Sequence, residues 1–419
     1  MPIGWDNQIK RMSKTILLIG TLDTKGTEFA YVRDLIHARG HRVLMVDTGV
    51  LGDPLFTPDI GADEVAAAAG TSLKRLRERG DRGEAIDAMI QGVRTLVPRL
   101  YAEGRFDGVL SLGGGGGTNV ATSAMRELPV GVPKLMVSTV ASADTRPYVG
   151  VKDITMMYSV VDIAGLNPLS RRILANAVGS ICGMVEQEVP EAEDRPLIAA
   201  SMFGVTTPCV NQMRERLEAA GYELLVFHAT GTGGQAMEGL IDAGFFSAVA
   251  DMTTTEWCDE VVGGMLSAGP DRLGAAARTG VPQVVSCGAL DMVNFRALDT
   301  VPERFRDRHL YRHNPNVTLM RTTPEECAEI GRRIAEQLNK STGPTTLLIP
   351  LRGVSSMDAD GQPFHDPEAD AALFQALRDH VRPPVEIVEL DLHINDPAFA
   401  EAAVDRLLAL IEEHRIQKA

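Results

Sequence analysis

The chain has 419 residues, of which 44% are hydrophobic and 23% are charged, and its formal net charge at pH 7 is −15. This length is too great for one compact core and predicts two domains. The acidic balance argues against nucleic-acid partners, because binding them requires a basic face that displaces counterions.

The cysteines and the apolar runs indicate a cytoplasmic protein. The five cysteines are widely spaced and form no C-x-x-C pair, which argues against a disulfide framework and against a thiolate zinc site. No apolar run reaches the length that spans a bilayer. We therefore expect a cytoplasmic chain without membrane partners.

Short β-branched runs alternate with longer helical patterns, which is typical of parallel sheets with crossover helices. In the first half, strands are expected at 15–20, 42–47, 108–112, 134–139 and 154–158, and helices at 26–39, 63–79, 83–103, 118–127 and 168–187. In the second half, strands are expected at 196–202, 223–228, 247–251, 283–287, 317–321, 345–350 and 385–391. Helices are expected there at 207–220, 233–243, 256–266, 271–279, 324–340, 367–380 and 397–415.

The acidic stretch 188–196 is bracketed by prolines and cannot continue a helix or join a central strand. It predicts an N-terminal domain at 1–190 and a C-terminal domain at 191–419. The predicted fold class is α/β, with two Rossmann-like domains of mainly parallel sheets and a ligand cleft between them.

The first strand ends in a turn that is suited to anions. Its backbone amides point to one spot at the start of a helix, and such spots bind phosphate. Lys25 adds a charge that neutralises phosphate, and Asp23 either orients a hydroxyl or holds Mg²⁺ through water. The alternative is a capped strand–helix junction with a solvated lysine. The candidate ligand-binding residues of this turn are Thr21, Asp23, Thr24, Lys25 and Gly26.

A run of five glycines ends the third predicted strand and gives a stronger signal. Glycine costs backbone entropy, so turn geometry alone explains five in a row poorly. Without Cβ atoms the loop lets a ligand lie against the main chain, at the positive end of the next helix. The alternative is a flexible hinge. The candidate residues are Gly113, Gly114, Gly115, Gly116, Gly117, Thr118 and Asn119.

Three charged residues at other strand ends extend this predicted site. Asp47 closes the second strand, where an acid in a Rossmann-like unit accepts hydrogen bonds from ribose hydroxyls, although it is equally suited to capping a loop. Arg146 is a candidate for binding phosphate and Asp144 for binding a metal or a sugar. The alternative for this pair is an internal ion pair.

Four residues of the second half are candidates for catalysis: His228, Glu256, His313 and Arg352. His228 ends a strand before a glycine-rich turn at 231–234, a place suited to general acid–base work. His313 precedes a predicted strand, and Arg352 follows one. No H-E-x-x-H or comparable spacing is present, so His228, Glu256 and His313 are not predicted to be metal ligands.

Several of these motifs together resemble the Tm-one-like ATP-binding family, the inhibitory domain of a plant tobamovirus-resistance protein with bacterial relatives of unassigned function. The motifs lie at 21–26, 113–119, 144–147, 228–234, 313–315 and 352–355. The resemblance covers almost the whole chain. It implies two Rossmann-like domains facing each other across a cleft, ATP on the first glycine loop, and dimers. It implies no particular reaction.

We therefore predict an ATP-binding two-domain protein that forms homodimers or higher homo-oligomers. If it is an enzyme, phosphoryl transfer with ATP and Mg²⁺ to a small anionic substrate is the expected chemistry. One alternative is a non-catalytic nucleotide-sensing or protein-interaction module. Another is an isomerase or lyase of a phosphorylated or carboxylated sugar, in which both glycine loops hold the substrate. A dinucleotide dehydrogenase is disfavoured because G-x-G-x-x-G is absent.

Overall fold

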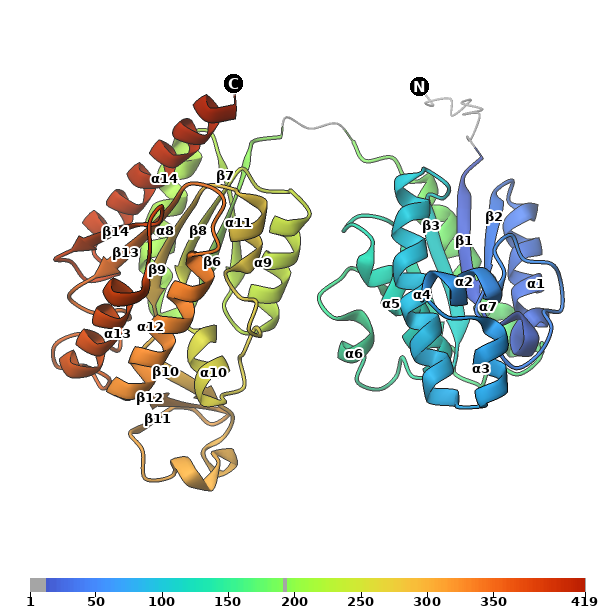
Figure 1. Ribbon diagram of the computed structural model, residues 1–419, viewed down its shortest axis with the longest axis horizontal. Coiled ribbons are helices and arrows are strands. Elements are labelled where there is room, and N and C mark those ends of the chain that lie inside the picture. Colours follow the sequence, from blue (N-terminus) through green and yellow to red (C-terminus); the bar gives the residue numbers. More distant parts are fainter. Residues whose placement is uncertain (1–12, 191–193, 419) are drawn as a thin grey trace, which may run out of the picture. The chain divides into compact units, whose positions relative to one another are not determined.

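The computed structural model describes residues 13–190 and 194–418, and the chain divides into two compact units, Met1–Glu191 and Ala192–Ala419 (Figure 1). We call them unit 1 and unit 2. The predicted domain boundary follows residue 190, next to this division. Residues 191–193 of the predicted linker lie outside the described residues.

Unit 1 contains a five-stranded parallel sheet with the strand order β2-β1-β3-β4-β5. The strands are β1 (Thr15–Gly20), β2 (Arg42–Asp47), β3 (Gly108–Gly113), β4 (Lys134–Ser138) and β5 (Thr155–Tyr158). The helices are α1 (Leu22–Ala38), α2 (Ala62–Ala68), α3 (Leu73–Arg79), α4 (Arg82–Ala102), α5 (Gly115–Glu127), α6 (Arg146–Val149) and α7 (Pro168–Glu186).

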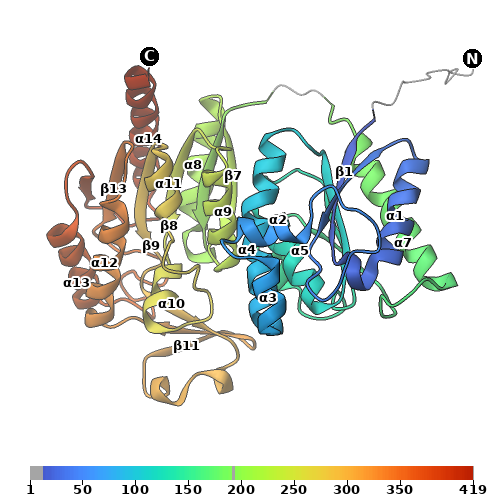
Figure 2. The same cartoon turned by 45° about the vertical axis from the view of Figure 1, so that its right-hand side comes forward.

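Helices cover both faces of this sheet, because its central strands are apolar on both sides. Alternate residues of β1 point to opposite faces, and those from Ile16 to Ile19 are all buried. Leu17 and Ile19 pack with α2, α4 and α5, whereas Ile16 and Leu18 pack with α1 and α7. The ribbons show the same division (Figure 1 and Figure 2).

Unit 2 contains a six-stranded parallel sheet with the order β14-β13-β9-β8-β6-β7 and a separate three-stranded antiparallel sheet, β10-β12-β11. The parallel strands are β6 (Leu197–Met202), β7 (Glu223–His228), β8 (Ala248–Thr253), β9 (Gln283–Gly288), β13 (Thr345–Pro350) and β14 (Glu386–Leu390). The antiparallel strands are β10 (Met292–Phe295), β11 (Leu310–Asn314) and β12 (Val317–Arg321).

The helices of unit 2 again cover both faces of the parallel sheet. One face packs against α8 and α14, and the other against α9 and α11 at one end and α12 and α13 at the other. The α-helices are α8 (Thr207–Ala219), α9 (Thr232–Asp242), α10 (Glu256–Val262), α11 (Gly274–Thr279), α12 (Pro324–Leu338), α13 (Pro367–His380) and α14 (Pro397–Lys418). The 3₁₀ turns are η1 (Gly204–Thr206), η2 (Leu298–Thr300) and η3 (Glu303–Phe305).

The predicted fold class, α/β with two Rossmann-like units, is confirmed. The helix predicted at 63–79 is in fact two helices, because Gly70 adopts φ +74° and Ser72 then caps α3 by accepting a hydrogen bond from the Arg75 amide. The helix predicted at 256–266 ends at Val262, since Gly263 adopts φ +98°. Among the described residues, no helix is long and apolar enough to cross a membrane.

Candidate functional site

Two turns of unit 1 meet at the carboxyl edge of its sheet. The chain passes from β1 to β2 on one side and later to β3 on the other side of β1. Ligands of open parallel sheets bind at such a switch point. A cavity of about 570 Å³ lies here, which is within the usual size range of small-molecule sites. Its lining residues from the two turns are Thr21, Asp23, Thr24, Lys25, Gly114, Gly115, Gly116 and Gly117.

The glycine turn begins α5 and leaves its amides free. Gly114 caps the helix without a side-chain hydrogen bond, so the amides of Gly115, Gly116 and Gly117 occupy the helical positions that have no intrahelical partner. Within residues 13–190, no side chain accepts a hydrogen bond from these three amides. The positive end of the α5 dipole therefore faces the cavity, and none of residues 13–190 supplies a partner for it.

The fold itself does not require glycine at the first helical positions of α5. None of the five glycines adopts a positive φ. A Cβ atom on Gly115 would meet no other atom within 4 Å, and one on Gly116 would lie at an ordinary 3.5 Å from Ile86. Gly113 differs, because its Cβ would lie 3.2 Å from the Gly117 Cα. Internal packing thus explains Gly113, while Gly115 and Gly116 leave open space beside the cavity.

The turn after β1 contributes a lysine and two hydroxyls. Lys25 lies at a kink in α1, where its φ of −129° and ψ of 22° are not helical. Its ammonium group donates a hydrogen bond to the Ile163 carbonyl and remains in the cavity lining. The Thr24 hydroxyl donates to the Thr21 hydroxyl at 2.8 Å. These side chains are close enough to the glycine turn to share one ligand.

Asp23 shapes the cavity wall instead of presenting a free carboxylate. Its Oδ2 accepts hydrogen bonds from the amides of Leu51 at 2.8 Å and Gly52 at 3.1 Å. Its Oδ1 is buried, and no partner for it is found in the described part of the chain. Asp23 therefore holds the loop after β2 against the turn after β1, which is a different role from the predicted contact with a ligand hydroxyl.

Sequence reasoning missed the rest of the cavity wall. Two arginines belong to it: Arg77 donates to the Val50 and Gly52 carbonyls at 2.9 and 2.6 Å, whereas no ion pair of Arg82 is found among the described residues. No local motif marks these arginines, because α3 and α4 reach the site only through the fold. The apolar part of the wall consists of Val50, Leu51, Leu76, Ala85, Ile86, Met89 and Val120.

Seven predicted ligand residues do not line the cavity: Gly26, Asp47, Gly113, Thr118, Asn119, Asp144 and Arg146. Asp47 is buried, and its Oδ1 accepts hydrogen bonds from the Leu22 and Gly49 amides, both at 2.9 Å. Burial raises the pKa of this carboxyl. Asp47 thus connects two backbone turns, as in the loop-capping alternative. Thr118 is also buried, and its hydroxyl bonds to the Ser138 hydroxyl at 2.7 Å.

Gly26 and Asn119 lie away from the cavity as well. Gly26 packs against Leu55, whose Cβ would be 2.4 Å from an added Cβ. Asn119 is half-buried on α5 outside the lining. These two corrections have one cause: residues of a helix point to different sides, so only some residues of α1 and α5 face the cavity.

The predicted Asp144 and Arg146 form an ion pair with each other. Arg146 donates Nε and Nη2 to the two Asp144 oxygens at 2.8 and 2.6 Å, and both side chains are exposed. The guanidinium lowers the pKa of Asp144 to about 2. Neither residue lines the cavity. The internal ion pair, which was the alternative interpretation, is what the structure shows.

The four predicted catalytic residues do not form one site. His228 ends β7 and Arg352 follows β13, and four interstrand spacings, or about 19 Å, separate these strands. The His228 ring lies 5.3 Å from the Phe203 ring, and Arg352 pairs with Asp391 at 2.7 Å. His313 precedes β12, as predicted, but it lies exposed within β11 of the antiparallel sheet.

Glu256 is fully buried and cannot face a substrate. Its Oε1 accepts hydrogen bonds from the amides of Gly231 at 2.7 Å and Gly234 at 3.1 Å. Its Oε2 accepts from Arg272 Nε at 2.6 Å. The second glycine-rich turn, which resembled an anion site in sequence, thus already holds an internal carboxylate.

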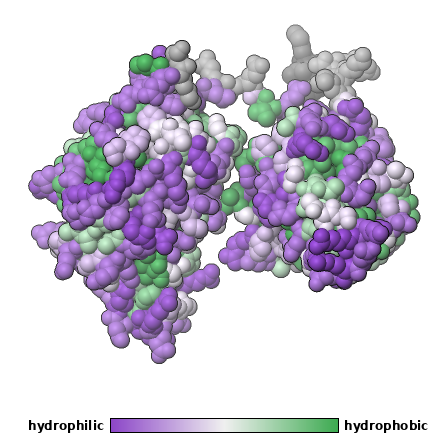
Figure 3. All heavy atoms as spheres, in the orientation of Figure 1, coloured by the Kyte–Doolittle hydropathy of each residue, from purple (hydrophilic) through white to green (hydrophobic). Residues whose placement is uncertain are grey.

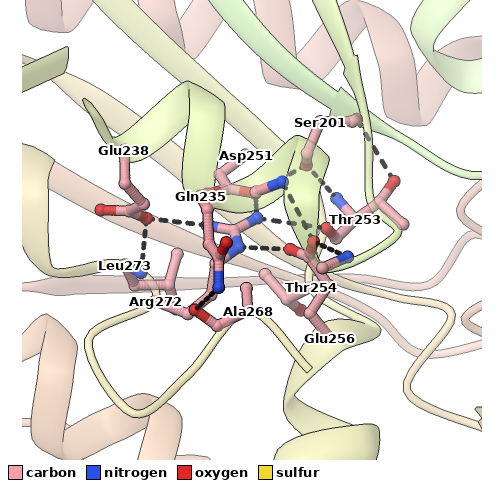
Figure 4. A network of polar contacts seen from close by, with 12 residues as sticks. Ser201, Gln235, Glu238, Asp251, Thr253, Thr254, Glu256, Ala268, Arg272 and Leu273 are labelled. Carbon is pink, nitrogen blue, oxygen red and sulfur yellow. Dashed lines mark hydrogen bonds and ion pairs between the residues drawn. The ribbon is translucent and has the colours of Figure 1, made fainter. Parts of the chain in front are cut away.

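Arg272 is the centre of this buried network, where it lies among three carboxylates (Figure 4). Besides Glu256 it contacts Asp251, with Nη2 to Oδ1 at 2.6 Å, and Glu238 at 3.1 Å. Burial raises the pKa of Glu238. In the described part of the chain, no group of three or more metal-ligating side chains is arranged to hold a metal ion.

Comparisons with known proteins identify a family that matches both halves of the chain. Residues 14–190 match the N-terminal domain, and residues 195–411 the C-terminal domain, of "Uncharacterised protein family (UPF0261)". A "UPF0261 protein" of Clostridium tetani (strain Massachusetts / E88) is 54% identical over 96% of this chain and 100% of its own length. A UDP-N-acetylglucosamine 2-epimerase from Rickettsia bellii covers 96% of this chain and 97% of its own, but with 9% identity and a TM-score of 0.23 it supports no inference.

The tomato (Solanum lycopersicum) "ToMV resistance protein Tm-1(GCR237)" is 43% identical over 96% of this chain. The match covers 56% of the tomato protein, so a large part of that protein has no counterpart here. This relative confirms the family that the motifs resembled, while ATP binding stays a prediction. The chain thus belongs to the UPF0261 family, with both of its domains present.

Proposed function

We propose that unit 1 binds a nucleotide, ATP or a close analogue, in the cavity between the turn after β1 and the glycine turn. One observation carries the proposal: Gly115 and Gly116 are required neither by backbone conformation nor by packing, yet they lie beside a cavity of about 570 Å³. Glycine at such positions serves a ligand that approaches the main chain closely.

The phosphates are assigned to the glycine end of the cavity. The three free amides of α5 and the positive end of its dipole attract anions. Lys25 and Arg82 line the same cavity and supply two positive charges. A triphosphate needs both kinds of group, since amides fix its oxygens and cations neutralise its charge.

The nucleobase is assigned to the apolar wall. Ile86, Met89 and Val120 present aliphatic and thioether surface to the cavity. Ligand sites usually combine such a wall with a few polar groups at one end. The choice of ATP among phosphorylated ligands rests on the resemblance to the Tm-one-like family.

Binding is favoured over phosphoryl transfer, because the carboxylates of the cavity hold backbone amides. Asp23 accepts from the Leu51 and Gly52 amides, and Asp81 accepts from the Glu84 amide at 2.9 Å. A role as a catalytic base would disturb these contacts. Mg²⁺ is usually held by substrate phosphates and one or two carboxylates. If ATP binding requires Mg²⁺, Asp23 is the carboxylate proposed to contact the metal ion.

Isothermal titration calorimetry of the full chain tests the proposal, with ATP, ADP, NAD and phosphate, each with and without Mg²⁺. We expect ATP to bind more tightly than inorganic phosphate and Gly115→Ala to weaken ATP binding. Gly179→Ala in α7 is the matched control, since its Cβ would also meet nothing within 4 Å but lies outside the cavity. Equal affinity for ATP and phosphate would instead indicate a sugar-phosphate ligand.

If the protein binds ATP without hydrolysing it, the proposed function is nucleotide sensing. Saturating ATP at about 100 times its Kd should stabilise the protein by about 2.7 kcal/mol and raise its melting temperature. Phosphate release should stay at the background rate in the same samples. Release above background with a panel of small acids and sugar acids would instead favour phosphoryl transfer.

A further inference from the structure

The segment between β10 and β12 forms a positively charged lobe on an acidic protein. Residues 296–316, which we call the basic lobe, contain five arginines and three acidic residues, whereas the whole chain carries a net charge of −15. The lobe contains η2, η3 and the edge strand β11. The space-filling view shows a largely hydrophilic surface at this end of unit 2 (Figure 3).

The lobe is anchored by Phe305, which two of the arginines cover. The Phe305 ring is buried and lies 5.6 Å from the Phe295 ring. The guanidinium groups of Arg304 and Arg308 lie 4.6 and 5.9 Å from its centroid. Arg308 also donates to both Glu326 oxygens, at 2.9 and 2.7 Å. The contacts of Arg304 and Arg308 therefore serve the structure of the lobe.

Arg306 and Arg312 have no such role. Both are exposed, and within residues 194–418 neither forms an ion pair. Together with Arg308 they line a hollow of about 720 Å³. Its other lining residues are Ala297, Leu298, Asp299, Leu310 and Pro315. Because Glu326 neutralises Arg308 and Asp299 offsets one arginine, the hollow keeps a net positive charge.

We propose that this hollow binds a small ligand that carries phosphate or carboxylate groups. The planar fork of arginine pairs bidentately with both kinds of oxyanion, and here two forks with unshared donors line one space. The size of the hollow suits a small molecule. A long polyanion such as RNA is disfavoured by the charge of −15 over the chain. The site belongs to unit 2 and does not depend on the nucleotide cavity of unit 1.

Calorimetry of the full chain with pyrophosphate, and separately with succinate, tests this site and separates the two oxyanions. We expect the double substitution Arg306→Gln, Arg312→Gln to weaken the binding of the better probe about tenfold or more, the value of one or two lost charge-assisted hydrogen bonds. Arg296→Gln is the control, since Arg296 is exposed on the same lobe outside the hollow and has no part in the packing around Phe305. Arg312→Lys keeps the charge without the fork and should give intermediate affinity.

Gly115→Ala distinguishes this site from the cavity of unit 1. If pyrophosphate binds at both places, Gly115→Ala removes one component and the double arginine substitution removes the other. Binding of both probes that is unchanged in the double variant and in Arg312→Lys would overturn the proposal, whatever the result for ATP. Pyrophosphate binding that is lost in Gly115→Ala and unchanged in the double arginine variant would lie wholly in unit 1. If the double variant also leaves succinate binding unchanged, the proposal is overturned.

Discussion

The two glycine-rich turns of this chain follow the same sequence pattern, yet they differ in what their amides bind. In unit 2, the Glu256 carboxylate accepts hydrogen bonds from the Gly231 and Gly234 amides. In unit 1, no side chain among the described residues does this for Gly115, Gly116 or Gly117. The pattern of strand, glycines and helix therefore predicts an anion site, but the anion is part of the protein in one case.

The two turns also differ in whether the fold requires their glycines. Gly231 adopts φ +80°, and a Cβ on Gly234 would lie 2.2 Å from the Glu256 carboxylate. The fold of unit 2 thus requires both. Gly115 has neither constraint. A turn whose glycines the fold does not need is the better candidate for a ligand site.

The largest effect is expected from removing the internal anion. Glu256→Ala leaves two buried amides and part of the Arg272 charge without partners and should lower the free energy of unfolding by about 3–5 kcal/mol. Urea denaturation followed by fluorescence measures this, in a Trp5→Phe background that makes Trp257 of unit 2 the reporter. Glu413→Ala is the control, because its ion pair is half-exposed and should cost less than about 1 kcal/mol. A loss for Glu256→Ala no larger than that would show that the network is dispensable.

The second-largest effect is expected when a glycine in each turn is replaced by alanine and the stabilities of the two variants are compared. Gly234→Ala should destabilise unit 2 by about 2 kcal/mol, because the new methyl group overlaps a fixed carboxylate. Gly115→Ala should leave stability unchanged or raise it by up to about 1 kcal/mol, since alanine suits a helix better than glycine. Thermal unfolding of both variants measures the difference. A strong destabilisation by Gly115→Ala would mean that the fold does need this glycine.

Buried carboxylates should make the stability of unit 2 fall as the pH rises. Burial raises the pKa of Asp259 from 3.8 to about 7, and burial together with Asp358 raises the pKa of Asp291. The folded state then holds protons that the unfolded state releases, so this stabilisation is complete below about pH 4 and is lost as the pH rises through about 7. Urea denaturation at pH 5, 6, 7 and 8 should show a decline of up to about 1.4 kcal/mol per pH unit for each carboxyl.

Asp291→Asn tests the origin of that decline. The substitution keeps the shape of a fully buried side chain whose Oδ1 has no partner among the described residues, and it removes the charge. We expect a smaller slope and higher stability at pH 8 than in the natural sequence. An unchanged slope would assign the pH dependence to other groups.

The smallest effect concerns the cation at the nucleotide cavity. Lys25→Ala should weaken ATP binding about tenfold, the value of one charge-assisted contact, with little loss of stability because its one hydrogen bond is to the Ile163 carbonyl. Arg33→Ala is the control, since Arg33 lies on α1 but pairs with Asp34 away from the cavity. Equal ATP affinities for Lys25→Ala and Arg33→Ala would remove Lys25 from the site.

The sequence predicted much of the fold because both parallel sheets are built from local signals. Apolar strand runs, helix caps and glycine turns place most elements within a few residues of their observed bounds. The antiparallel strands β10 and β11 were missed, because Met292–Phe295 is short and the Leu310–Asn314 segment is mostly exposed and polar. Neither segment has the apolar run of a strand buried on both faces.

The site was predicted in part, because a strand end marks a place but not the direction of a side chain. The glycine turn and Lys25 line one cavity, yet Asp47 and Glu256 turn inward to backbone amides. Arg82 lies on α4, which is distant in sequence from both turns, so no sequence pattern connects it with the cavity. Burial and amide contacts, which decide between ligand site and internal cap, appear only in the folded chain.

Selective ¹⁵N-glycine labelling tests the central comparison most directly, because it reports on both turns in one spectrum. On addition of ATP, we predict that the amide signals of Gly115, Gly116 and Gly117 shift, while those of Gly231 and Gly234, already bound to Glu256, keep their positions. ATP that binds and leaves the three unit 1 signals unmoved would contradict the account.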